Sequence, residues 1–76
     1  MNTKDREVMS IVYDCINIIT GMYPTNPANT KAKFKCLDLI NKASSPLLYS
    51  LSCLNYEEHE RAKDYALEAL DILNKR

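Results

Sequence analysis

Apolar residues in the first third of the chain recur at helical spacing. From Thr3 to about Met22 they fall on one broad side of a helix, and they are Val8, Ile11, Val12, Cys15, Ile16, Ile18, Ile19 and Met22. A narrow polar stripe lies opposite and consists of Ser10, Asp14, Asn17 and Gly21. A strand would place Asp14 and Ile16 on the same face, which breaks the alternation that strands require. The pattern therefore predicts a helix covered on more than one flank, which we expect to be the central element.

The stretch GMYPTNPANT, residues 21–30, interrupts this helical pattern. Gly21 and Pro24 are typical of a helix end, and Asn26 followed by Pro27 is typical of a helix start. A stop signal followed by a start signal predicts a connector between two helices. The alternative is a binding loop whose side chains contact a ligand, and these side chains are Tyr23, Thr25, Asn29 and Thr30.

The middle of the chain predicts one long helix and one short one. The long helix should run from Pro27 or Ala28 to about Ala43. Its expected buried stripe is Ala32, Cys36, Leu37, Leu39, Ile40 and Ala43. The sequence Ser44-Ser45-Pro46 repeats the cap-then-proline pattern and predicts a new, short helix over Leu47 to Leu54. Its buried side is expected to contain Leu47, Leu48, Leu51 and Leu54.

A last helix is predicted to begin at Asn55, which with Glu58 has the spacing of a capping box. Its core face is expected to contain Ala62, Tyr65, Ala66, Ala69, Leu70, Ile72 and Leu73, with small alanines that allow a close approach to the first helix. The fold class predicted for residues 1–76 is all-α, a single domain formed by a small compact bundle of three long helices plus one short helix.

Length and charge limit the classes of function. A chain of 76 residues supports one domain with a modest core, so self-association is a plausible source of added stability. The ten basic and ten acidic residues balance, so no global field draws the protein to nucleic acid or to an anionic membrane. The polar start MNTKDREV is unlike a signal peptide or a membrane span, and we expect a cytoplasmic protein. Its three cysteines, which form no CxxC pair, are interpreted as reduced core residues.

His59 is the one candidate for acid–base chemistry. It lies among carboxylates, but Glu58 and Glu60 are its sequence neighbours and point to other faces of the helix. The side chain expected beside it is Lys63, four residues on. We therefore predict no catalytic residue, no metal site and no cofactor, and interpret His59 as a partly exposed helix residue at the edge of the core.

Four lysines give the second helix a net positive charge, and they are Lys31, Lys33, Lys35 and Lys42. Phosphate groups bind such charges, and a base would stack on Phe34 or Tyr23 nearby. The lysines point several ways around the helix, and no recognition-helix or glycine-rich phosphate motif accompanies them. A nucleic-acid-associated protein is the alternative hypothesis.

Three large apolar or aromatic residues, Phe34, Tyr56 and Leu67, lie at or beyond the margins of the predicted core stripes. On the last helix, Leu67 is surrounded by charged residues, and the outer side includes Glu60, Lys63, Asp64 and Asp71. We expect these residues to form a contact surface for a protein partner or for a second copy of the chain. The leading hypothesis is a small non-enzymatic interaction module, a regulator or inhibitor of the kind found among bacterial or phage accessory proteins, which docks through a helical surface.

Overall fold

The computed structural model describes residues 3–22 and 30–75, and these residues form three helices without a strand. They are α1 (Thr3–Met22), α2 (Thr30–Asn55) and α3 (His59–Asn74). The prediction of an all-α fold is confirmed. The predicted connector and its four candidate ligand-binding side chains lie largely outside the described residues. Within the described part of the chain, no helix is both long enough and apolar enough to cross a membrane.

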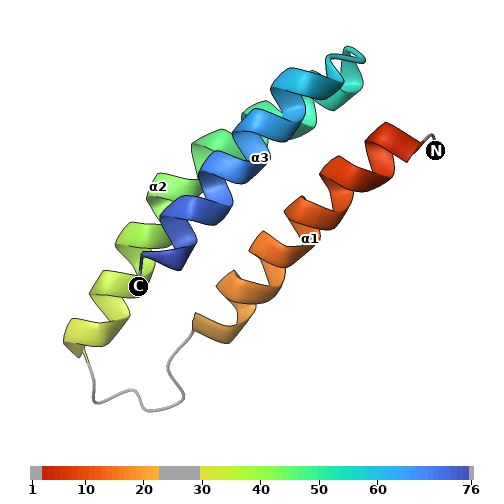
Figure 1. The fold of residues 1–76 in the computed structure, drawn as a ribbon. Helices are drawn as coiled ribbons and strands as arrows, with labels where there is room; N and C mark the ends of the chain where they lie inside the picture. Colours follow the sequence, from red (N-terminus) through yellow and green to blue (C-terminus); the bar gives the residue numbers. More distant parts are fainter. Residues whose placement is uncertain (1–2, 23–29, 76) are drawn as a thin grey trace.

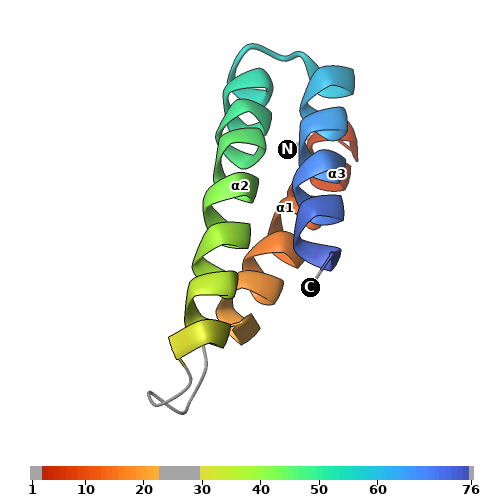
Figure 2. The same ribbon diagram turned by 90° about the vertical axis from the view of Figure 1, so that its left-hand side faces the viewer.

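The helix α3 lies between its two neighbours (Figure 1). It packs along α2 and along α1, whereas α1 and α2 scarcely touch each other. Asp5 contacts His59 at one end of the bundle, and Met22 shares a core cluster with Leu73 at the other. The helices α1 and α3 therefore run parallel, and α2 runs antiparallel to both (Figure 2). The expectation that the first helix is central is wrong, because α3 is the element that both others share.

Small residues on α3 explain its position. Ala62, Ala66 and Ala69 have no exposed surface, and they let backbone approach backbone on both sides of the helix. Toward α2, the buried Ser50 hydroxyl donates a hydrogen bond of 2.7 Å to the Ala62 carbonyl oxygen. Toward α1, the Cys15 sulfur lies 3.9 Å from the Ala66 carbonyl oxygen. The predicted close approach of the alanines to the first helix is confirmed.

The core surrounds these alanines and is divided into two clusters along the bundle. The first cluster is built on Val8, Val12, Cys53, Ala62 and Ala66, and the second on Cys15, Met22, Ala43, Ala69 and Leu73. All of the α1 members belong to the predicted apolar side. Ile16, from the same predicted side, is 45% exposed, so the apolar side of α1 is only partly covered.

The helix α2 continues through Pro46, so the predicted short separate helix does not exist. Proline lacks the amide that would bond to the carbonyl of Lys42, and an interior proline costs a helix about 3 kcal/mol. Packing on α3 offsets this cost, because Ala43 and Ser50 on either side of Pro46 are completely buried. Pro46 is itself buried.

A continuous α2 also changes which leucines are inside. Leu47 and Leu54 are half-buried against the core, as predicted. Leu48 and Leu51 are 67% and 42% exposed, so their predicted burial is wrong, and so is that of Leu37, which is 37% exposed. Leu48 cannot share one helical face with Leu47 and Leu54, because consecutive residues are turned by about 100° around the helix axis.

The turn between α2 and α3 is closed by backbone hydrogen bonds. The amide of Glu58 donates to Cys53 O at 2.8 Å, and the amide of Glu57 donates to Leu54 O at 3.1 Å. This pair of bonds is a Schellman motif, and its left-handed residue is Glu57, with φ of 60°. The predicted capping box is wrong, since Asn55 ends α2 and Glu58 is the N-cap of α3 without a side-chain cap bond.

The left-handed residue of this turn generates a stability prediction. Glycine adopts positive φ without the Cβ clash that Glu57 experiences, so Glu57→Gly should raise the free energy of unfolding by about 0.5–1 kcal/mol. Urea denaturation followed by circular dichroism measures the change. The control is Glu60→Gly inside α3, which should lower stability by about 1 kcal/mol. A decrease for Glu57→Gly would contradict the assigned backbone conformation.

Candidate functional site

His59 contacts α1 rather than its expected helical neighbour. Its Nδ1 atom lies 2.7 Å from Asp5 Oδ1, and both side chains are largely buried, with exposures of 22% and 29%. The contact is an ion pair when the imidazole is protonated. It joins the first turn of α1 to the first turn of α3, so the geometry gives His59 a role in helix docking. Among residues 3–22 and 30–75, no three His, Cys, Asp or Glu side chains are grouped to hold a metal ion.

Lys63 makes the second polar contact between α1 and α3. Its Nζ atom donates a hydrogen bond to the Glu7 carboxylate. This hydrogen bond, together with the negative charge of Glu7, raises the pKa of the Lys63 amine. Lys63 was expected on a partner-binding surface, and the structure shows that its amine contacts α1.

The acidic residues predicted on the last helix are exposed, among them Glu60, Asp64 and Asp71. The Lys75 Nζ atom lies 3.3 Å from Oδ2 of Asp71, four residues earlier. The Arg61 Nη1 atom lies 3.5 Å from Glu58 Oε2. Glu57, four residues before Arg61, lies in the left-handed turn outside the helix, so helical spacing does not apply to this pair.

The three apolar residues predicted to lie outside the core are exposed but do not form one patch. Phe34 is 66% exposed, Tyr56 is 73% exposed and Leu67 is 44% exposed. Phe34 and Tyr56 lie near opposite ends of α2, about 33 Å apart along the helix axis. Leu67 is on α3 among charged residues. The structure therefore does not bring the predicted contact surface together.

A different surface emerges along α2, which we name the outer row. Its members are Phe34, Leu37, Asn41, Ser44, Leu48 and Leu51. They alternate three and four residues apart, as the a and d positions of a heptad do. Leu48 is 67% exposed, the highest value among the four apolar members, so its burial within the monomer contributes little to stability. Sequence reasoning missed this row because Pro46 was interpreted as a helix break, although the spacing of three and four continues across it.

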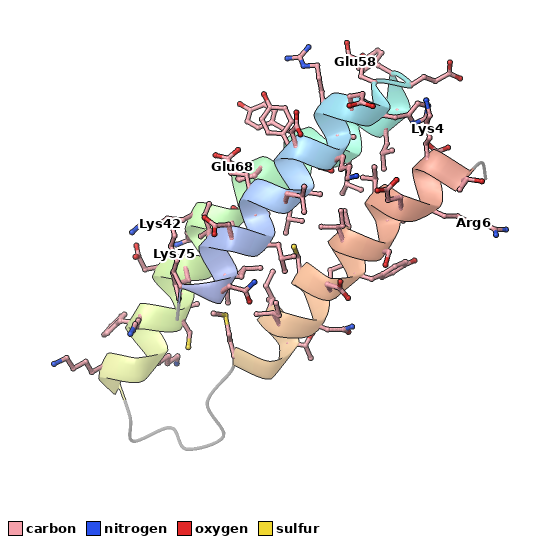
Figure 3. The ribbon with its side chains drawn as sticks, viewed as in Figure 1. Lys4, Arg6, Lys42, Glu58, Glu68 and Lys75 are labelled. Atoms are coloured by element: carbon pink, nitrogen blue, oxygen red, sulfur yellow. The ribbon has the colours of Figure 1, made fainter. Side chains whose placement is uncertain are left out.

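The opposite flank of α2 is charged and aromatic. All four predicted lysines are exposed, and helical spacing places Lys31, Lys35 and Lys42 on one side, away from Lys33. The Lys42 Nζ atom lies 2.9 Å from Asp38 Oδ2, one helical turn earlier. Figure 3 shows Lys42, Glu68 and Lys75 on one side of the molecule and Arg6 pointing away from it on the other.

Two tyrosines form an aromatic pair on this same flank. The rings of Tyr49 on α2 and Tyr65 on α3 lie 5.4 Å apart, tilted by 32°. They border a shallow hollow between the two helices that Lys42 and Glu68 also line. The pair closes the α2–α3 seam on the side away from α1.

The three cysteines are free, with Cys15 and Cys53 buried and Cys36 half-buried. Burial in an apolar environment, followed by the negative charge of Asp14, raises the pKa of the Cys15 thiol. The Cys36 sulfur lies 3.1 Å from the Met22 carbonyl oxygen. Cys15 is therefore a protonated, poorly nucleophilic core residue at neutral pH.

Comparisons of the chain with protein-family models, with curated proteins and with solved structures found no match.

The Glu7–Lys63 contact predicts a pH-dependent contribution to stability. Because the folded-state pKa of Lys63 is raised, this contribution is fully present below the ordinary lysine value of about 10.4. It is lost as the pH rises through the folded-state value. Glu7→Gln should therefore lower the melting temperature slightly at pH 7, and the difference from the wild type should shrink in strong alkali and in high salt.

The control for this prediction is Glu68→Gln, which removes an exposed carboxylate of α3 on the side that borders Tyr49 and Lys42. Thermal unfolding measured over a series of pH values compares the two variants. A Glu7→Gln difference that persists unchanged to the highest pH would contradict the role assigned to the Lys63 charge.

Proposed function

We propose that this chain is a small non-enzymatic interaction protein that docks a helical surface onto a protein partner and acts as a regulator or inhibitor. The observation that supports this proposal best is the outer row of α2. Its four large apolar members, Phe34, Leu37, Leu48 and Leu51, are all at least 37% exposed.

The order within this row distinguishes it from ordinary surface apolarity. Single exposed apolar residues are normal on soluble proteins. Here they follow one helix for about 26 Å at the spacing of three and four residues that helix-in-groove recognition uses. The row contains no charged residue. Such a face is suited to burial against another apolar helix or groove.

The acidic face of α3 is the second part of the proposed surface. Glu60, Asp64 and Asp71 are exposed there, with Leu67 as the single large apolar residue in their midst. Exposed charges contribute mainly to the rate and specificity of association rather than to affinity. We assign the anchoring contacts to α2, and assign to α3 the electrostatic attraction of a partner with a basic surface.

A capture experiment tests this proposal. The tagged full chain should retain a partner from its native cell, and Leu48→Lys should reduce retention at least tenfold, since loss of an anchor costs upward of about 1.4 kcal/mol. Ile16→Lys, a matched replacement at a 45% exposed position on α1 outside both parts of the proposed surface, should leave most of the retention intact. Circular dichroism of both variants establishes that helicity is unchanged. Failure to retain any protein, or equal retention by Leu48→Lys, would overturn the proposal.

Nucleic-acid binding is a second candidate function, favoured by the shared side of Lys31, Lys35 and Lys42. The ring of Tyr49, 59% exposed, follows on the same flank and offers a stacking surface. A labelled single-stranded oligonucleotide should then bind at low salt, with affinity falling steeply as salt rises. Lys31→Glu and Lys35→Glu should each weaken binding, whereas Lys33→Glu, on the other side of α2, should have a smaller effect. Absence of binding at low salt would exclude this function.

A further inference from the structure

The outer row of α2 is complementary to itself when two copies are placed antiparallel. In antiparallel helix pairs each a position packs against a d position of the other helix. Phe34 then faces Leu51 of the second copy, and Leu37 faces Leu48 of the second copy. In this register large apolar side chains meet large apolar side chains at both ends of the row.

The same register pairs the polar members of the row at its centre. Asn41 faces Ser44 of the second copy, and symmetry repeats the pairing on the other side of the two-fold axis. The side-chain amide of Asn41 can donate a hydrogen bond to the Ser44 hydroxyl oxygen of the second copy. That oxygen is free to accept, because the Ser44 hydroxyl donates its own hydrogen to the Asn41 carbonyl oxygen of the same chain at 2.8 Å. A shift of the two helices by one heptad would place these polar groups against leucine, so the polar centre selects one register.

Charge decides between antiparallel and parallel pairing. The first half of α2 is basic, with exposed Lys31, Lys33 and Lys35, and the turn after its other end is acidic, with exposed Glu57 and Glu58. Antiparallel pairing places Lys31 opposite Leu54 of the second copy, beside the end of α2 that leads into this acidic turn. Parallel pairing would place these lysines beside the same lysines of the second copy, where like charges repel.

The position of the row on α2 leaves it accessible to a second helix. Ser50 points to α3, where its hydroxyl bonds to Ala62 O. Leu48 is turned about 160° from Ser50 around the helix axis, so it faces away from α3. Because α1 scarcely touches α2, it does not cover this face either.

From these observations we infer that the outer row of α2 is the interface of a two-fold symmetric, antiparallel dimer of this chain. The inference rests on the proposed function, because it names a second copy as the partner of the same surface. A single helical face buries less than the roughly 800 Å² per partner of a standard interface. The dimer is therefore reversible, with a dissociation constant of roughly micromolar order.

Sedimentation equilibrium of the full chain from about 1 µM to several hundred µM tests the dimer. The apparent mass should rise from 8.7 kDa toward twice that value as concentration increases. Leu48→Lys should raise the dissociation constant at least tenfold, whereas Ile16→Lys on α1 should change it less than twofold. A chain that remains monomeric throughout, or a dimer that tolerates Leu48→Lys, would overturn the inference.

A charge exchange tests the antiparallel direction. Lys31→Glu and Glu57→Lys should each weaken the dimer severalfold at low salt, and the double variant should recover most of the loss. Single variants that strengthen association would show parallel pairing and overturn the arrangement.

The two proposals fail in different ways. A chain that stays monomeric but loses a captured partner on Leu48→Lys would overturn the dimer and leave the proposed function standing. A chain that dimerises through the row but retains no other protein from the cell would support the dimer and overturn the regulatory role.

Discussion

The alanine face of α3 is the constraint on which the bundle depends. Ala62, Ala66 and Ala69 lie where larger side chains would separate α3 from α1 and α2 at once. Their small size lets Ser50 reach the Ala62 carbonyl directly and brings Cys15 close to Ala66. Because α3 contacts both partners while α1 and α2 scarcely touch, two helical interfaces share this one face.

This arrangement also explains why so much apolar surface remains outside. A helix between two others covers one side of each, and the side of α2 that faces away from α3 remains uncovered. Leu48 at 67% exposure and Phe34 at 66% lie on that side. A chain of 76 residues buries a smaller fraction of its surface than a larger domain, and this exposed face is where the proposed association would add stability.

Periodicity in the sequence was sufficient to predict the all-α class, the span of the first helix and the alanine face of the last. It failed where tertiary contacts override a local signal. Pro46 is a strong helix breaker, but the buried residues on both sides of it hold α2 together, and no local pattern contains that information. Asn55 and Glu58 had the spacing of a cap, whereas the chain closes the turn with backbone bonds and a left-handed Glu57. The contact of His59 with Asp5 joins residues far apart in sequence, so helical spacing could not reveal it.

The proline inside α2 has a consequence for the order of folding. The helix cannot propagate cheaply across Pro46 until packing compensates for the missing hydrogen bond. The segment after the proline is joined to α3 by a short turn, so its contacts close the smallest loops in the chain. We expect this hairpin to form the nucleus, with the first half of α2 and then α1 added to it. A proline at this position thereby divides one long helix into an early half and a late half.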